Sequence, residues 1–220
     1  MENQKRLVAI NDISGFGKCS LTVALPIISA AGVETICMPT AVLSTHTGGF
    51  TGFTYRDLTC DMPAIGEHWK SIKLNPDAIY SGFLGSFDQI DIVKKFADDF
   101  KTDKNLFIAD PCMADHGVMY KIFDEKFAKA MAELCAKADI ILPNITEACF
   151  MTDEKFVEGV QTEDYIVNLL NKLLDMGAKN VVLTGVSFED SKVGAACMGQ
   201  DRVPHYYFEN RLPGAYHGTG

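Results

Sequence analysis

The stretch Leu106-Phe107-Ile108-Ala109-Asp110-Pro111 decides the fold of this chain. Four consecutive apolar residues, with no polar ones between them, are typical of a β-strand buried on both faces, and the polar Asp110 marks its end. Comparable short apolar runs occupy residues 7–10, 35–38, 41–43, 78–80, 140–142 and 181–183. Most of them are separated by a segment with helical spacing. We therefore predict an α/β fold with a mostly parallel sheet that is covered by helices on both faces.

Capping residues mark the starts of the expected helices. Asp61 and Thr162 each stand where an N-cap side chain belongs, and Ser86 with Gln89 has the spacing of a capping box. Pro26 is expected to kink the first helix. The expected helices cover about residues 20–31, 62–75, 86–100, 124–138 and 162–176.

Composition excludes several classes of partner. The 220 residues carry a net charge of −9 with no local basic run, which argues against a nucleic-acid or membrane surface. No apolar run has the length of a membrane span and no secretory signal precedes the first strand, so we expect a cytoplasmic protein. The seven cysteines include no Cys-x-x-Cys pair, which favours reduced thiols over a disulfide framework or a zinc site.

Polar residues gather at the ends of the expected strands. In open α/β sheets, ligands bind beyond the carboxyl ends of the strands. The residues concerned are Asp12, His46, Thr47, Ser81, Asp110, Asp115, Asn144, Glu147 and Thr184. One such residue alone is more often a helix cap or a turn residue, but the number of them favours a ligand site. His46 and Thr47 could donate hydrogen bonds to a hydroxylated ring.

Two glycine-bearing segments offer backbone N–H groups to a ligand. The segment 11–18 is not a P-loop, because Cys19 stands where Ser or Thr is required, and Glu34 comes too early for a dinucleotide fingerprint. We interpret it as a close approach of the backbone to a small ligand. Gly218-Thr219-Gly220 can form a nest for an anion, although a flexible terminus has the same composition.

Taken in order, these segments resemble the ribokinase-like superfamily, and within it the pyridoxal/pyridoxamine kinases of vitamin B6. The motifs that carry the resemblance are Asn11-Asp12-Ile13-Ser14-Gly15-Phe16-Gly17, Ser44-Thr45-His46-Thr47-Gly48, Ser81-Gly82-Phe83-Leu84-Gly85-Ser86, Asp110-Pro111-Cys112-Met113-Ala114-Asp115, Pro143-Asn144-Ile145-Thr146-Glu147, Thr184-Gly185 and Gly218-Thr219-Gly220. The resemblance implies a single three-layer kinase domain over residues 1–220 that lacks its C-terminal part. Residues 44–55 would form a flap over the site.

The resemblance also implies an activity, which is phosphorylation of the 5′-hydroxyl of pyridoxal, pyridoxine or pyridoxamine by ATP. The implied residues at Mg²⁺ are Asp110 and Glu147, the latter through water. The implied nucleotide-binding residues are Asp115, Tyr120, Asn144, Thr184 and Gly185. The implied vitamer-binding residues are Asp12, His46, Thr47 and Phe83, whose ring would stack on the pyridine. The implied anion hole for the transferring phosphoryl group consists of Gly218, Thr219 and Gly220.

The chain departs from the family pattern at three places. Ala114 stands where glycine is common, and Leu142 replaces a threonine that can ligate a monovalent cation in relatives, so a monovalent cation remains an open cofactor. In the family a catalytic aspartate follows the Gly-Thr-Gly nest at once, whereas this sequence ends at Gly220. Since a general base contributes roughly 10²–10⁴-fold, we expect little kinase turnover from the 220-residue fragment itself.

Other functions stay open. The chain could be another kinase of the same superfamily, acting on hydroxymethylpyrimidine or a sugar. It could also be a catalytically silent protein that binds a B6 vitamer or serves as an interaction subunit. A metal-dependent hydrolase is disfavoured, because the histidines lack the spacing of metal ligands. Since family members are often dimers, the resemblance also implies a homodimer.

Overall fold

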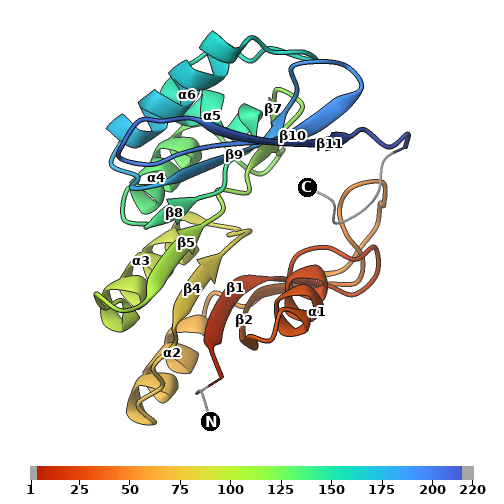
Figure 1. Ribbon diagram of the computed structural model, residues 1–220. Helices are drawn as coiled ribbons and strands as arrows, with labels where there is room; N and C mark the ends of the chain where they lie inside the picture. Colours follow the sequence, from red (N-terminus) through yellow and green to blue (C-terminus); the bar gives the residue numbers. More distant parts are fainter. Residues whose placement is uncertain (1–3, 215–220) are drawn as a thin grey trace. The chain divides into compact units, whose positions relative to one another are not determined.

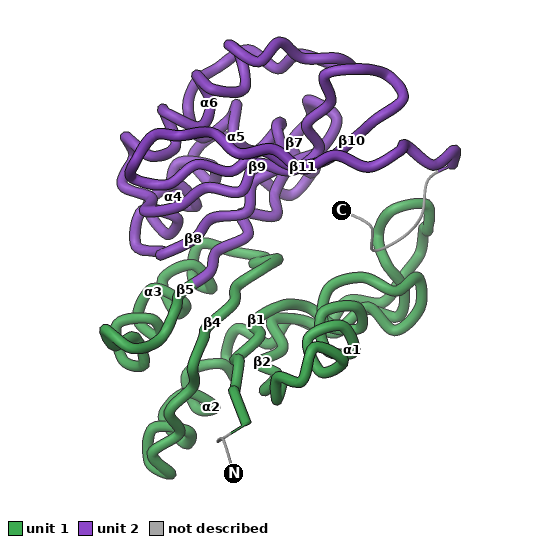
Figure 2. Tube along the Cα trace, in the orientation of Figure 1, with its two compact units in different colours: residues 1–107, 216–219 green, residues 108–215, 220 purple. Residues whose placement is uncertain are grey.

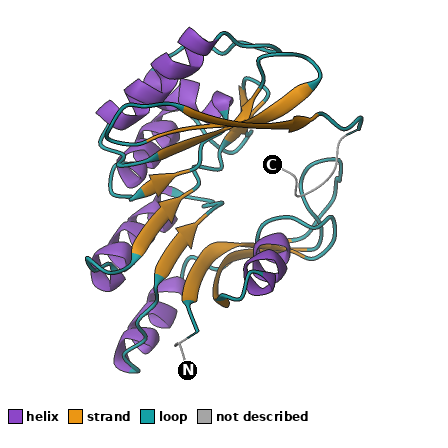
Figure 3. Cartoon of the chain, viewed as in Figure 1, coloured by secondary structure: helices purple, strands orange, loops and turns teal. Residues whose placement is uncertain are grey.

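The computed structural model describes residues 4–214, which form two compact units that meet in sequence at Phe107 and Ile108 (Figure 2). Strands and helices alternate along both units, and the expected α/β class is confirmed (Figure 3). Gly218, Thr219 and Gly220 lie outside the described residues. The expected single domain and flap stay predictions. Among the described residues, no helix combines the length and the apolar character that crossing a bilayer requires.

The first unit contains strands in the order β4-β1-β2-β3. They are β1 (Arg6–Ser14), β2 (Glu34–Leu43), β3 (Tyr55–Asp57) and β4 (Ala78–Ser81). β1 is parallel to both β2 and β4, whereas β3 runs antiparallel to β2. Because β1 has a neighbouring strand on each side and helices over its faces, Val8, Ala9 and Ile10 are completely buried.

Helices cover both faces of this sheet. α1 (Leu21–Ala30) packs against β1 and β2, and α2 (Met62–Ser71) and α3 (Phe87–Phe100) lie on the opposite face (Figure 1). α3 begins where the Ser86 hydroxyl accepts a hydrogen bond from the Gln89 N–H at 3.3 Å. The expected start of this helix is therefore confirmed.

The second unit contains strands in the order β11-β10-β9-β8-β5. They are β5 (Leu106–Ala109), whose first two residues are the last of the first unit, β8 (Ile140–Ile141), β9 (Val181–Val186), β10 (Lys192–Met198) and β11 (His205–Asn210). Parallel pairs join β5 to β8 and β8 to β9, and β10 is antiparallel to both of its neighbours. A separate antiparallel hairpin consists of β6 (Ala114–Asp115) and β7 (Val118–Met119). The helices α4 (Glu125–Cys135), α5 (Ile145–Thr152) and α6 (Glu163–Asp175) lie on one face of the main sheet (Figure 1).

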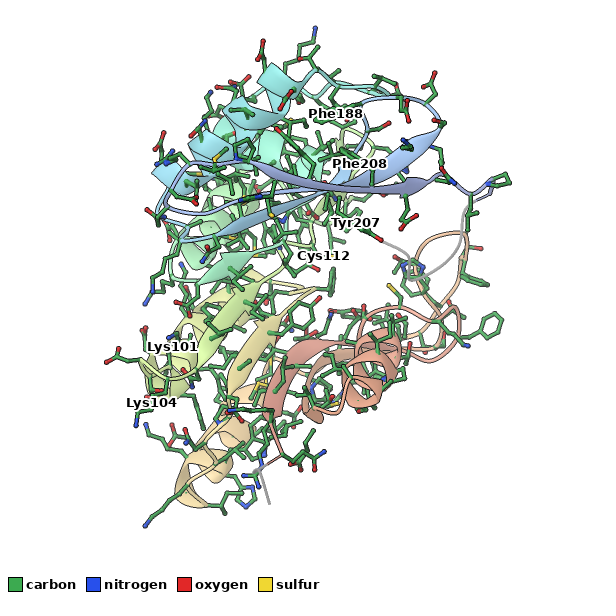
Figure 4. All side chains as sticks on the ribbon, viewed as in Figure 1. Lys101, Lys104, Cys112, Phe188, Tyr207 and Phe208 are labelled. Carbon is green, nitrogen blue, oxygen red and sulfur yellow. The ribbon has the colours of Figure 1, made fainter. Side chains whose placement is uncertain are left out.

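An aromatic cluster supports the last strand of the second unit. The ring of Phe188 lies 5.3 Å from that of Tyr206 and 5.1 Å from that of Phe208, between ring centroids (Figure 4). Tyr207, which lies between Tyr206 and Phe208 in sequence, is 67% exposed. This alternation is what a strand with one packed and one open face requires.

Several element boundaries differ from those expected from the sequence. β1 continues beyond Ile10 to Ser14, because its outer residues still pair with β2. The runs at 35–38 and 41–43 are a single strand that passes through Pro39. The Asp61 side chain makes no capping hydrogen bond, because its backbone is already helical with φ −87° and ψ −30°. The fourth helix ends at Cys135, earlier than expected.

Candidate functional site

The predicted site residues that the structure describes fall into two groups, one in each unit. The first unit holds Asp12, His46, Thr47 and Phe83. The second unit holds Asp110, Asp115, Tyr120, Asn144, Glu147, Thr184 and Gly185. The predicted anion hole of Gly218, Thr219 and Gly220 lies outside the described residues.

Glu147 is the buried carboxyl group of the second unit. It lies in the first turn of α5 and is 3% exposed. Its Oε1 accepts a hydrogen bond from the Met113 N–H at 3.0 Å, and its Oε2 accepts one from the Asn144 N–H at 2.9 Å. Burial raises the pKa of Glu147, and the nearby charge of Asp110 raises it further, against the lowering effect of the backbone donors. A cation beside this pair of carboxyl groups would favour the ionised form of Glu147.

Asn144 joins three segments of the second unit. Its Oδ1 accepts a hydrogen bond from the Glu147 N–H at 2.9 Å, which completes a reciprocal capping box at the start of α5. Its Nδ2 donates to the carbonyl of Ala114 at 2.8 Å, and its backbone bridges to Thr184. The cap explains why these residue types stand here, and it also fixes the carboxyl group of Glu147 beside the hairpin.

The hairpin of β6 and β7 carries Asp115, and Tyr120 follows it. The Asp115 Oδ1 accepts a hydrogen bond from the His116 N–H at 2.8 Å, so the carboxylate supports its own turn. The Tyr120 N–H donates to the Met113 carbonyl at 2.9 Å. Burial raises the pKa of Tyr120, and so does the nearby side chain of Cys112 (Figure 4). The Tyr120 hydroxyl therefore stays protonated near neutral pH and can donate a hydrogen bond.

Thr184 and Gly185 lie near the carboxyl end of β9. The Thr184 N–H donates to the Pro143 carbonyl at 2.9 Å. Gly185 is exposed and has φ +76°, and a Cβ placed on it would meet nothing within 4 Å. Its backbone conformation, rather than crowding, therefore explains the glycine. The position leaves room for a ligand to approach the main chain.

The acidic residues of the second unit fit a magnesium ion better than a metal that needs a dense ligand shell. Among the described residues, no group of three or more His, Cys, Asp or Glu side chains is placed to hold a metal. Mg²⁺, however, usually takes one or two carboxylates and completes its shell with water and substrate phosphates. Asp110 and Glu147, close enough for the charge of one to raise the pKa of the other, match that donor set.

Asp12 and His46 occupy different surroundings in the first unit. Asp12 lies within β1, is 5% exposed, and its Oδ2 accepts a hydrogen bond from the Ser14 hydroxyl at 3.0 Å. The His46 N–H donates to the Phe16 carbonyl at 2.7 Å. Its ring lies against Gly48, where an added Cβ would come within 2.9 Å of the His46 Cε1. Glycine at this position thus leaves space for the imidazole.

The segment 44–55, which includes the exposed Thr47, is tied at its base. The Ser44 N–H donates to the Thr54 carbonyl at 3.2 Å, and the Thr54 N–H donates to the Ser44 hydroxyl oxygen at 2.9 Å. The rings of Phe16 and Phe50 meet edge to face at 5.6 Å. The segment is therefore a loop with a closed base.

Phe83 is half-buried just beyond the end of β4. Its N–H donates to the Asn11 Oδ1 at 2.9 Å and its carbonyl accepts from the Thr40 hydroxyl at 3.2 Å. The neighbouring Ser81 hydroxyl is buried and has no hydrogen-bond partner among the described residues. No role of its own could be assigned to Asn11 from the sequence, although Asn11 begins the first motif of the resemblance, and no sequence signal pointed to Thr40.

A comparison with protein families matches residues 25–220 to the phosphomethylpyrimidine kinase family. Among curated relatives, the chain is similar to the hydroxymethylpyrimidine/phosphomethylpyrimidine kinase of Bacillus subtilis (strain 168), with 29% identity over 66% of this chain and 51% of the relative. It is also similar to the pyridoxal kinase PdxY of Pseudomonas putida (strain GB-1), with 27% identity over 86% of this chain and 65% of the relative. The chain thus spans about half to two thirds of the length of these relatives.

Solved structures include more similar chains. A candidate phosphomethylpyrimidine kinase of Bacteroides thetaiotaomicron VPI-5482 shares 38% identity with a TM-score of 0.93, and the match covers 99% of this chain and 75% of that one. A second crystal form of that protein, solved with pyridoxal, matches with a TM-score of 0.89 over 96% of this chain and 74% of that one. Pyridoxal kinase from Lactobacillus plantarum shares 31% identity with a TM-score of 0.87 over 99% of this chain and 76% of that one.

Proposed function

This chain belongs to the phosphomethylpyrimidine kinase family, and we propose that it transfers the terminal phosphoryl group of ATP to the 5′-hydroxyl of pyridoxal, pyridoxine or pyridoxamine. The observation that carries the proposal is the pyridoxal in the structure of a relative that is 38% identical over 96% of this chain. The 31% identity to a pyridoxal kinase over 99% of the chain supports the same substrate class.

In this proposal the second unit binds the nucleotide. The Tyr120 hydroxyl, which stays protonated, donates to a phosphate oxygen, and Asn144 keeps the carboxyl group of Glu147 in place by the cap that it forms. The exposed backbone at Gly185 lies against the nucleotide. Asp115 and Thr184 complete the nucleotide-binding set.

Asp110 and Glu147 would hold Mg²⁺, which neutralises charge on the β- and γ-phosphates when it is bound. The backbone N–H groups of Gly218, Thr219 and Gly220 are proposed to donate to the transferring phosphoryl group. Phosphoryl transfer depends mainly on positioning and on electrostatic stabilisation, so these groups need not form covalent bonds to the substrate.

The first unit binds the vitamer in this proposal. Phe83 offers an aromatic face for the pyridine ring. Asp12, His46 and Thr47 offer a carboxylate, an imidazole and a hydroxyl to the substituents of that ring. A sugar has no aromatic face to stack on Phe83, so this set of side chains favours a heterocycle.

Titration of the purified chain with pyridoxal, followed by its absorbance, tests the proposal without requiring turnover. We expect saturable binding, about tenfold weaker binding by Phe83→Ala because an aromatic contact is lost, and no change for Phe87→Ala, whose ring is 47% exposed at the start of α3. ATP-dependent formation of pyridoxal phosphate is then measured, with Asp110→Asn against the exposed Asp103→Asn as its control. Binding without turnover in any condition would favour a silent binder, and absence of binding would refute the proposal.

Hydroxymethylpyrimidine is the second candidate substrate, favoured by the 29% identity to the Bacillus subtilis enzyme. A panel of pyridoxal, hydroxymethylpyrimidine and ribose at one ATP concentration separates the candidates by kcat/KM. If hydroxymethylpyrimidine gives the highest kcat/KM, it replaces the vitamer as the proposed substrate.

We also propose that the protein is a homodimer. α1 carries no charged side chain, and only Leu21 of its residues is buried in the described structure. Leu25 is 40% and Ile27 is 63% exposed, which leaves an apolar surface of the kind that a partner covers. Light scattering after gel filtration should give twice the chain mass for the wild type and a monomer for Ile27→Lys.

A further inference from the structure

We infer that Asn11 and Thr40 are positioning residues, which hold the backbone of Phe83 so that its ring meets the vitamer in one fixed orientation. The inference rests on the proposed function for the role of Phe83 and adds the residues that place it. Both residues act within the first unit, and they act through Phe83 rather than on the reacting atoms.

Asn11 extends the pairing of β1 with β4 beyond the point where the two backbones separate. The last backbone hydrogen bond at this end of the pair runs from the Gly82 N–H to the Ile10 carbonyl at 2.9 Å. The Asn11 Oδ1 then accepts the Phe83 N–H at 2.9 Å and also the Asp12 N–H at 3.0 Å. One side-chain oxygen therefore fixes two backbone segments that both carry predicted vitamer-binding residues.

Gly82 makes room for this amide. A Cβ on Gly82 would lie 2.2 Å from the Asn11 Nδ2, closer than any non-bonded contact permits. The Asn11 side chain is 6% exposed, so it has little space to move away. The hydrogen bond by which Asn11 holds the Phe83 backbone, called here the clamp, therefore requires glycine at position 82.

Thr40 holds the other side of Phe83. It is completely buried in β2, and its hydroxyl donates to the Phe83 carbonyl at 3.2 Å. Both polar groups of the Phe83 backbone are consequently bound to buried side chains, which fixes the direction in which the side chain leaves the main chain.

Gln89 ties the same loop at a third place. It is completely buried in α3, its Nε2 donates to the Thr40 carbonyl at 3.0 Å, and its Oε1 accepts from the Gly85 N–H at 2.7 Å. Buried polar networks of this kind are costly when incomplete and specify one geometry when complete. Buried polar side chains from β1, β2 and α3 all bind this short loop, which indicates that the position of Phe83 matters.

Thr40→Val removes the hydroxyl while keeping the branched shape, and Thr40→Ser keeps the hydroxyl. We expect pyridoxal to bind roughly fivefold more weakly to Thr40→Val, from the loss of one hydrogen bond, and with wild-type affinity to Thr40→Ser. The Kd for ATP should not change in either variant. In a Phe83→Leu background, Thr40→Val should change the pyridoxal Kd less than twofold, because the residue through which it acts has gone.

Gln161→Met is the matched control. Gln161 is a buried amide that holds a loop of the second unit, with its Oε1 accepting the Ser187 N–H at 2.9 Å. Its replacement should lower the Tm and leave the pyridoxal Kd unchanged. Should Thr40→Val fail to fold, Thr40→Ala, which also removes the hydroxyl, is measured in its place with the same expectations.

The outcomes separate the two proposals. A folded Thr40→Val protein with wild-type affinity for pyridoxal would overturn the positioning role and leave the proposed function intact. Equal weakening in the wild-type and Phe83→Leu backgrounds would also overturn it, because the hydroxyl would then act independently of Phe83. A wild-type protein that binds no B6 vitamer would overturn both.

Discussion

The hydroxyl of Thr146, on α5, accepts a hydrogen bond from the backbone N–H of Gly117, in the turn of the β6–β7 hairpin, at 3.0 Å. Thr146 is 2% exposed, so this contact anchors the hairpin to the helix that also carries Glu147. The hairpin contains Asp115, which we assign to nucleotide binding. The Thr146 side chain therefore holds in place the hairpin that we expect to contact the nucleotide.

Thr146→Val should weaken ATP binding without unfolding the protein. The substitution leaves the Gly117 N–H without its acceptor, which costs about 1–2 kcal/mol. We expect the Kd for ATP to rise about fivefold and the Kd for pyridoxal to stay unchanged. Thr152→Val is the matched control, because that hydroxyl donates only within α5, to the Ala148 carbonyl at 2.7 Å. An equal effect of both substitutions on ATP would contradict the anchoring role.

Gly117→Ala should destabilise the protein more than Gly159→Ala. Both glycines have a positive φ, +74° and +79°, so each substitution carries a backbone cost of about 1 kcal/mol. A Cβ on Gly117 would also lie 2.7 Å from the Phe156 Cδ1, whereas a Cβ on Gly159 would meet nothing within 4 Å. Urea denaturation should show a difference of about 1–2 kcal/mol between the variants. Adding Phe156→Leu to Gly117→Ala should recover part of the lost stability, because the smaller side chain relieves the contact with the new Cβ.

Glu147→Gln should change how stability depends on pH. Because burial and Asp110 raise the pKa of Glu147, the folded ligand-free protein holds a proton on this carboxyl group more tightly than the unfolded chain does. Its contribution to stability is therefore complete below the ordinary glutamate pKa and is lost as pH rises through the raised value. From pH 5 to 8, the unfolding free energy of the wild type should fall relative to that of Glu147→Gln.

Magnesium provides the check on this assignment. If Asp110 and Glu147 hold Mg²⁺, saturating Mg²⁺ should reduce the fall in stability of the wild type and leave Glu147→Gln nearly unaffected. Parallel pH profiles for the two proteins, with and without Mg²⁺, would show that this carboxyl does not titrate differently in the folded state.

Gly194→Ala should disrupt the pairing of β10 with β11. A Cβ on Gly194 would lie 1.8 Å from the Tyr207 carbonyl oxygen, and a backbone atom in a strand cannot move aside. We expect a loss of about 3 kcal/mol or more in urea denaturation. Gly199→Ala serves as the control, since its nearest contact is a side-chain atom, the Asn180 Oδ1, at the much longer distance of 3.0 Å. Similar stabilities of the two variants would contradict the tight approach at Gly194.

The elements that the sequence predicted well are those with local signals. The strand at Leu106 and the helix starts at Ser86 and Thr162 depend on consecutive apolar residues or on a side chain that caps its own helix. β10 and β11 were not predicted, because β10 consists largely of small residues with weak strand propensity and its pairing with β11 depends on the close approach at Gly194. The two-residue strands of the β6–β7 hairpin are likewise too short to leave a pattern.

The same division applies to the candidate site. Asn144 and Glu147 were recognisable because they follow an apolar strand and belong to a motif of the family that the chain resembles, and the structure adds that they form a helix cap. The roles of Asn11 and Thr40 were not recognisable, because they come from contacts with Phe83, which is 72 and 43 residues away in sequence. Contacts of this kind depend on which strands become neighbours, and no local pattern encodes them.

The contact between Asn11 and Gly82 also restricts how this protein can evolve. Any side chain at position 82 displaces the amide at position 11, and a smaller residue at position 11 gives up the clamp on Phe83. A protein in which only one of the two positions has changed therefore has a misplaced Phe83 ring. The two positions should therefore covary among descendants of this sequence, and a deep mutational scan should find position 82 intolerant until position 11 has changed.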